Sequence, residues 1–295
     1  MIKCRAMKSS GMKSFGQEFY PHEALRALRL AEKLKTSNRR ELTARIAREL
    51  PHPSELTRNR LAAKFVQRYI LATRSRIVPA SDRQPFVRLV SKLRHAPALI
   101  QLLFYELCKT DELVGVLARE LFYPVLIENR APREYSAAEF ATRNGSRLLE
   151  DEPLLTRAFV LDHAREKWNF QDRASVDRAL RVLIGAGLIA RERMADVRNH
   201  PVAYRLADHE LAPAAFAWAF YDEYLPRAHA GEVLIAREQI QTSNFARTFL
   251  LSPAQVEAAL ETARKHQLVA SHGTQLRLLF GDAGTLAEAL ISKAM

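Results

Sequence analysis

From residue 21 onwards, apolar side chains recur every three or four positions, which is the spacing of amphipathic helices. In residues 54–76, for example, Leu61, Phe65 and Tyr69 fall on one side of such a helix and charged residues fall on the other. Glycines and alternating, strand-like patterns are scarce in this region. The pattern therefore predicts an all-helical domain over residues 17–130.

A different pattern begins in the middle of the chain. A helix is expected from Pro153, and Asp172 can cap a second helix over residues 173–186, which ends before Gly187. The runs "LIARERM" and "VAYRLA" then flank a polar turn and are typical of a hairpin. Helix, turn, helix and hairpin is the order of a winged helix-turn-helix. We therefore expect a first winged helix at residues 148–208.

The same order recurs in the last third of the chain. An aromatic-rich helix is expected first, in "APAAFAWAFYDEYL". Ser252 and Gln255 then have the spacing of a capping box at the start of another helix. Further on, His272 and Gly273 form a two-residue turn between two apolar runs, which is a strong hairpin signal. The sequence thus predicts a second winged-helix-like module, closed by a C-terminal helix, at residues 209–295.

Together these patterns predict a mainly α fold: an N-terminal helical domain followed by two winged-helix-like modules with small β-hairpin wings. Residues 1–16 are rich in Lys, Ser and Gly, and we expect them to form a flexible tail. The polar residues 131–147 include Pro132 and Gly145 and are the expected linker.

Charge is distributed unevenly along the chain, which carries a formal net charge of +12. Residues 1–95 hold 22 basic and 7 acidic residues, a net charge of +15. The remaining 200 residues hold 23 basic and 26 acidic residues, a net charge of −3. Such asymmetry favours a polyanionic partner, most often nucleic acid, over the alternative of a basic helical face that only meets water.

One basic stripe is predicted within the N-terminal helical domain. Arg60, Lys64 and Arg68 are four residues apart, so they fall on the face opposite the apolar one. Glu55 is the only acidic residue nearby, so pairing within the helix does not account for the stripe. We therefore interpret it as a surface that contacts DNA phosphates. Three further arginines extend this candidate surface: Arg58, Arg74 and Arg76.

The first winged helix carries a second set of candidate DNA-binding residues on its second helix and wing. They are Arg173, Arg178, Arg181, Arg191, Arg193 and Arg198. The second module presents Glu257 and Glu261 at the corresponding helix, and carboxylates that face phosphates weaken binding. The second module is therefore the poorer candidate for DNA binding and the better one for docking a protein. Asp177, Glu192 and Asp196 partly cancel the arginines of the first module, so a protein partner stays open there too.

No pattern of an enzyme is evident. The sequence lacks the GxSxG, P-loop, HExxH and CxxC motifs, and Cys4 and Cys108 are too few for a four-cysteine zinc site. We predict a protein that is not an enzyme, with no cofactor and no metal site. Residues 96–108 form the longest apolar stretch, which is too short to span a membrane, so we expect a cytoplasmic protein with no membrane contact.

A polar group in "DHAREKW" has the spacing of a helical metal site. His163 and Glu166 are three residues apart, and Asp162 is one turn before Glu166. We interpret these residues instead as a surface group that forms ion pairs with Arg165 or Lys167.

Two segments carry a resemblance to a known family. They are "RLVSKLRHAPALIQLLFYELCKTDELVGVLARELFYPVL" and "WNFQDRASVDRALRVLIGAGLI", and they follow a basic helical N-terminal region. Over roughly residues 35–190 the order of elements resembles the BrxA family, the small DNA-binding component of bacterial BREX phage-defence systems. The resemblance implies a non-enzymatic DNA-binding subunit that works with methyltransferase, ATPase and other defence proteins. The extra C-terminal module departs from that pattern, and no functional residue carries over.

Three functions compete at this point. The leading hypothesis is a double-stranded DNA-binding protein that tolerates many sequences because it contacts mainly phosphates. The second is a tandem winged-helix scaffold that holds partner proteins, as in subunits of chromosome-organising ATPases. The third, a transcriptional regulator, requires sequence-specific binding and usually a dimer.

Overall fold

The computed structural model describes residues 19–34, 38–70, 85–144, 153–193, 202–227, 234–273 and 275–293. They fall into two compact units. Of the described residues, unit 1 contains Phe19 and Asp111–His209, and unit 2 combines Tyr20–Thr110 with Glu210–Met295. The all-helical region expected over residues 17–130 is thus divided after Thr110, and its larger part shares a unit with the C-terminal module.

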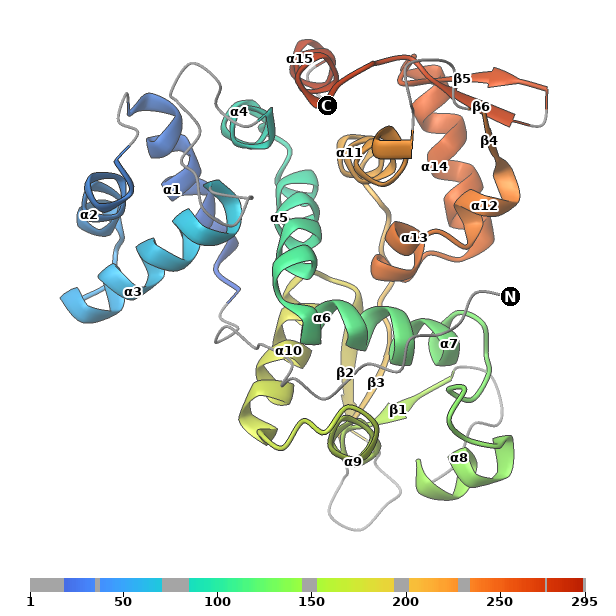
Figure 1. Cartoon of the computed structure of the whole chain (residues 1–295). Coiled ribbons are helices and arrows are strands. Elements are labelled where there is room, and N and C mark those ends of the chain that lie inside the picture. Colours follow the sequence, from blue (N-terminus) through green and yellow to red (C-terminus); the bar gives the residue numbers. More distant parts are fainter. Residues whose placement is uncertain are drawn as a thin grey trace. The chain divides into compact units, whose positions relative to one another are not determined.

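The fold is mainly α-helical, as predicted. In unit 2 the helices are α1 (Pro21–Lys33), α2 (Arg39–Glu49), α3 (Glu55–Phe65), the π-helical turn η1 (Val66–Ile70), α4 (Pro85–Lys92), α5 (Ala96–Thr110), α11 (Pro213–Tyr224), the 3-10 turn η4 (Leu225–Arg227), α12 (Arg237–Gln241), α13 (Asn244–Thr248), α14 (Pro253–Lys265) and α15 (Ala283–Ser292) (Figure 1). Unit 1 contains α6 (Glu112–Val116), the π-helical turn η3 (Leu117–Phe122), α7 (Tyr123–Leu126), α8 (Ala137–Arg143), α9 (Arg157–Lys167) and α10 (Arg173–Gly185).

Each unit contains one small antiparallel sheet of three strands. In unit 1 the strands are β1 (Leu155–Thr156), β2 (Ile189–Arg193) and β3 (Val202–Leu206), in the order β1-β3-β2. In unit 2 they are β4 (Leu234–Ala236), β5 (Val269–His272) and β6 (Gln275–Leu278), in the order β4-β6-β5. The two expected hairpins, β2–β3 and β5–β6, are confirmed.

Strands β1 and β4 are the elements that the sequence pattern missed. The helix expected from Pro153 starts only at Arg157, because Leu155 pairs with Tyr204 of β3. Thr156 then caps α9 by accepting a hydrogen bond from the N–H of Phe159. A strand of two residues has no detectable alternation, so the hydrophobic pattern could not separate it from a helical turn.

The two units contain a repeated arrangement of elements. Helices α10 and α14 both have 13 residues, and they begin 80 positions apart, at Arg173 and Pro253. Helices α9 and α12 begin at Arg157 and Arg237, which are 80 positions apart as well. In unit 1, α9 and α10 follow strand β1 and precede the β2–β3 hairpin. In unit 2, α12 and α14 follow strand β4 and precede the β5–β6 hairpin. The repeat predicted from the sequence is therefore present in the order of these elements, in the equal lengths of α10 and α14 and in the strand order of each sheet, although α12 is shorter than α9 and is followed by the additional helix α13.

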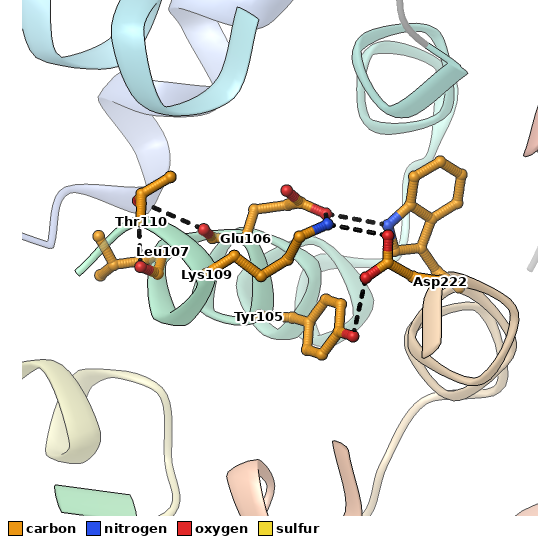
Figure 2. Close-up of polar contacts among 7 residues, drawn as sticks. Tyr105, Glu106, Leu107, Lys109, Thr110 and Asp222 are labelled. Carbon is orange, nitrogen blue, oxygen red and sulfur yellow. Dashed lines mark hydrogen bonds and ion pairs between the residues drawn. The ribbon is translucent and has the colours of Figure 1, made fainter. Parts of the chain in front are cut away.

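A buried polar cluster joins α5 to α11 inside unit 2 (Figure 2). Glu106 is 5% exposed, and its Oε1 accepts hydrogen bonds from the indole N–H of Trp218 at 3.2 Å and from Nζ of Lys109 at 3.1 Å. Lys109 also donates to Oδ1 of Asp222 at 2.9 Å, and the Tyr105 hydroxyl donates to Oδ2 of the same carboxylate at 3.0 Å. Burial raises the pKa of Glu106, while the Lys109 ammonium opposes that rise. The three hydrogen bonds that Trp218 and Asp222 of α11 form with α5 fix the relative position of the two helices.

A second polar contact holds the start of α11. The side-chain amide of Gln101 donates to the carbonyl of Glu210 at 2.6 Å, and its Oε1 accepts from the N–H of Ala212 at 2.8 Å. Aromatic contacts continue the interface, since the Phe86 and Trp218 rings lie 5.6 Å apart. Residues 20–110 and 210–295 therefore share one core. In the described part of the chain, no helix is long and apolar enough to cross a membrane.

Candidate nucleic-acid interface

Helix α10 has one buried face and one exposed face. Val176, Leu180 and Leu183 are at most 1% exposed, and they direct the opposite face outwards. Asp172 caps the helix by accepting a hydrogen bond from the N–H of Ala174 at 3.0 Å. Helix α10 also contacts α6 and β2, so it is held from both sides.

Two candidate arginines of α10 lie on the exposed face. Arg173 and Arg181 are exposed and form no ion pair with any residue that the structure describes. They are eight positions apart, about 12 Å along the helix axis, with Asp177 midway between them. The three side chains form one stripe, which we call the α10 stripe.

Arg157 compensates the carboxylate within this stripe. Its Nε and one terminal nitrogen donate to the two Asp177 oxygens at 2.7 and 2.6 Å, which is the bidentate geometry of a guanidinium–carboxylate pair. The pair raises the pKa of Arg157 above its ordinary value. Asp177 therefore does not cancel Arg173 or Arg181, and the α10 stripe together with Arg157 has an excess of positive charge.

The side chain of Arg178, a third candidate on α10, is held by hydrogen bonds within the helix. One of its terminal nitrogens donates to the Ser175 hydroxyl at 2.5 Å and to Oδ2 of Asp172 at 3.3 Å. The Ser175 hydroxyl also donates to Asp172, and together with backbone N–H groups it holds the pKa of that carboxyl below its usual value. Arg178 thus braces the first turn of α10.

The wing of unit 1 places Arg191 on an exposed position of β2, opposite Tyr204 of β3. The neighbouring Glu192 lies 3.6 Å from Nε of Arg205. Arg193 ends β2, but its side chain lies outside the described residues, and so does the whole of Arg198. Arg191 therefore extends the positive surface of unit 1 beyond α10.

The corresponding helix of unit 2, α14, carries two carboxylates that also meet arginines. Glu257 lies 3.3 Å from Arg237, and Glu261 lies 2.7 Å from Arg264 and 3.9 Å from Arg237. Arg237 and Glu257 stand 80 positions after Arg157 and Asp177, so an equivalent bridge joins the first residue of α9 to α10 in unit 1 and the first residue of α12 to α14 in unit 2. On α14, however, no arginine takes the positions of Arg173 and Arg181, which are Pro253 and Glu261.

Helix α3 does not present the basic stripe as predicted. Arg68 is only 4% exposed, so the prediction that it lies on the surface was wrong. Arg68 lies in the π-helical turn η1, which packs against α1, α2, α4 and α5, so its side chain is enclosed within unit 2. Arg60 is exposed and Lys64 half-buried, and both have contacts within the protein.

Of the other three DNA-binding candidates in this region, the structure describes only Arg58. Arg58 donates to the carbonyl of His52 at 2.5 Å and to that of Pro53 at 3.2 Å, and it closes the turn before α3. Arg74 and Arg76 lie outside the described residues.

A basic groove on α1 was missed from the sequence. His22, Arg26, Arg29 and Lys33 are all exposed and follow one another at spacings of four, three and four residues. They line a cavity of about 600 Å³ together with two leucines and Glu49 at the end of α2. The spacing is visible in "PHEALRALRLAEK", in which the buried residues are three alanines and Leu28. We call this feature the α1 groove.

The polar group of α9 is only partly as predicted. Arg165 pairs with Asp162 at 3.0 Å and with Glu166 at 3.6 Å, which confirms the expected ion pairing. His163, in contrast, is 1% exposed, and its Nδ1 lies 3.2 Å from the Tyr135 hydroxyl. It is a core residue because its ring packs against the rings of Tyr135, Phe159 and Trp168. Within the described ranges, no three His, Cys, Asp or Glu residues are grouped as a metal site would require.

Comparisons with known proteins add little to this description. No family model and no curated protein matches the sequence. Among solved structures, the chain is similar to a magnesium ion-bound SspB crystal structure, with a TM-score of 0.45 and 14% sequence identity. The match covers 95% of this chain and 87% of that one. A likeness at this level has no bearing on function.

Proposed function

We propose that this protein is a non-enzymatic double-stranded DNA-binding protein. The observation that carries the proposal is the α10 stripe, in which Arg173 and Arg181 are exposed without ion pairs among the described residues while Asp177 is occupied by Arg157. Free guanidinium groups on one helix face are suited to phosphate oxygens. Phosphate contacts carry no sequence information, so binding is expected to tolerate many sequences.

We further propose that each repeated arrangement is a winged helix. The support is the order of elements: α6 to α7, β1, α9, α10 and the β2–β3 hairpin in unit 1, and α11, β4, α12 to α13, α14 and the β5–β6 hairpin in unit 2. In a helix-turn-helix, the second helix of the pair enters the major groove. In unit 1 this helix is α10, with β2 as part of the wing.

The proposed setting is a bacterial phage-defence complex of the BREX type. It rests on the resemblance of residues 35–190 to the BrxA family, and its partners would be the methyltransferase and the ATPase of such a system. The contribution of this chain would be to hold the complex on duplex DNA.

The double variant Arg173→Ala/Arg181→Ala tests the DNA-binding proposal. Because each lost phosphate contact removes about one unit of salt dependence, the slope of log K against log salt should fall by about 2 in magnitude. The measurement is fluorescence anisotropy with a labelled duplex between about 50 and about 200 mM salt.

The matched control is Arg130→Ala/Arg133→Ala, which removes the same charge from exposed positions of unit 1 outside α10. Its slope should equal that of the wild type. If the wild-type chain does not bind duplex DNA, the proposal is wrong. If it binds and the α10 variant keeps the wild-type slope, α10 is not the binding surface.

A scaffold that holds partner proteins is the second candidate function. The observation that favours it is the carboxylate face of α14, where Glu257 and Glu261 stand in place of a basic stripe. A wild-type chain that fails to bind duplex DNA but forms a stable complex with a defence or chromosome-organising ATPase would favour this function.

A further inference from the structure

The lining of the α1 groove has more cationic than anionic side chains. Arg26, Arg29 and Lys33 line it, against a single carboxylate, that of Glu49. Its volume of about 600 Å³ falls within the range of ligand sites in proteins. His22 also lines the cavity.

The cations of the groove are available to a ligand. Arg29 and Lys33 form no hydrogen bond or ion pair with any residue in the described ranges. Arg26 donates to the backbone carbonyl of Glu49 at 3.2 Å, which leaves its other N–H groups for a ligand and fixes its direction. The aliphatic stems can lie along Leu25 and Leu30, which form the apolar part of the lining.

The spacing of these cations suits a linear polyanion. Arg26 and Lys33 are seven positions apart, or about 10 Å along the axis of α1. Because the phosphates of a strand follow one another at short, regular intervals, this length can contact more than one phosphate. An acidic protein surface is a weaker match, because the cores of protein interfaces are rich in aromatic residues and poor in lysine, and the lining of the groove has no aromatic residue.

We propose that the α1 groove binds the phosphodiester backbone of a nucleic acid and forms a phosphate-binding surface in unit 2 separate from the α10 stripe of unit 1. The inference rests on the proposed DNA-binding function and extends it to a second unit. It gives a phosphate-binding role to Arg26, Arg29 and Lys33, which are part of the large positive charge of the N-terminal third.

The test compares the full chain with Arg29→Ala/Lys33→Ala, whose two positions are exposed and lie outside the core. Binding to a labelled duplex, to a single strand of equal length and to polyglutamate is measured across the same salt range. The salt slope for nucleic acid should fall by about 2 in magnitude. The charge-preserving variant Arg29→Lys/Lys33→Arg should keep the wild-type slope, and Glu49→Gln should tighten binding at low salt.

The outcomes separate this inference from the proposed function. If Arg173→Ala/Arg181→Ala lowers the slope and Arg29→Ala/Lys33→Ala does not, the groove inference is wrong while the function stands. If the wild-type chain binds no nucleic acid, both are wrong. A loss confined to the single strand would support the groove as a phosphate site and assign it to unpaired nucleic acid. Tighter binding of polyglutamate than of either nucleic acid would overturn the inference in favour of an acidic protein partner.

Discussion

His163 is a buried histidine whose charge state matters for the stability of unit 1. Its ring packs edge-on against Trp168, with the ring centres 4.6 Å apart, and its Nε2 has no partner among the described residues. Burial, aided by the nearby Lys167 and Arg143 cations, lowers the pKa of His163 to about 4 from 6.5. The folded protein therefore holds this imidazole neutral, whereas the unfolded chain protonates it at mildly acidic pH.

The depressed pKa of His163 predicts acid sensitivity within a defined window. Because the folded pKa is below the unfolded one, the contribution to stability is complete above about pH 6.5 and is lost progressively as the pH falls towards about 4, by roughly 3 kcal/mol in all. Urea unfolding of the wild type and of His163→Phe between about pH 7 and about pH 4 measures it. The phenylalanine variant should lose less stability over this window, because it lacks the buried imidazole while the carboxylates of the chain titrate alike in both proteins. Parallel curves would contradict the prediction.

At the scale of single residues, the sequence predicted exposure only where helical geometry was regular. Arg173 and Arg181 lie on the exposed face as expected, because α10 is an uninterrupted α-helix. Arg68 is buried because η1 packs against four other helices of unit 2, and a four-residue spacing contains no signal for such contacts. His163 was placed at the surface because its polar neighbours in the sequence are there.

At the scale of elements, the repeat exposes a difference in how two equivalent helices end. Gly187 after α10 has a φ of 75°, and Gln267 after α14 has a φ of 51°, so both adopt the left-handed conformation. The next residue in each case, Leu188 or Leu268, donates back to a carbonyl of the last turn, at 3.1 and 2.9 Å. The geometry is the same, but glycine adopts it without a steric clash and glutamine does not.

The substitution Gln267→Gly is therefore expected to stabilise the protein by about 1 kcal/mol. Gln267 is exposed, so little packing is lost with its side chain. The matched variant Gly187→Ala should destabilise by about 1 kcal/mol, because it introduces the same clash at the equivalent position. Equilibrium unfolding in urea gives both free energies. A decrease in stability for Gln267→Gly would show that its side chain has a stabilising role.

The elements themselves were largely predictable where their end signals are strong. The capping box of Ser252 and Gln255 is present, and α14 begins at Pro253 as the sequence indicates. Asp172 likewise caps α10. Strands β1 and β4 were not found, because they have only two and three residues and pair with β3 and β6, which lie far away in the sequence. Likewise, the basic stripe of α1 was visible in the sequence, but the cavity beside it depends on the position of α2.

At the scale of the whole molecule, the chain order and the compact units do not coincide. Of the described residues, unit 1 contains Phe19 and Asp111–His209, and unit 2 contains residues on either side of the long stretch of unit 1. Hydrophobic periodicity reports which face of a helix is buried but not against which partner, so the sequence grouped α1 to α7 into one domain. Contacts such as that between the Phe104 and Phe249 rings, 5.9 Å apart, instead join the N-terminal helices to the C-terminal module.

This organisation predicts how fragments of the chain behave. A fragment of residues 111–209 should fold alone, because it contains the sheet and every described helix of unit 1. The cut before Asp111 leaves α5 and α6 intact, with Asp111 still capping α6. A fragment of residues 20–110 should not unfold cooperatively, because it exposes Phe86, Phe104 and the Glu106 cluster, which in the full chain meet α11 and α13. Co-expression with residues 210–295 should restore it. Circular dichroism during urea unfolding distinguishes these outcomes. A cooperative transition of the 20–110 fragment alone would contradict the shared core, and non-cooperative unfolding of the 111–209 fragment would mean that unit 1 depends on the rest of the chain.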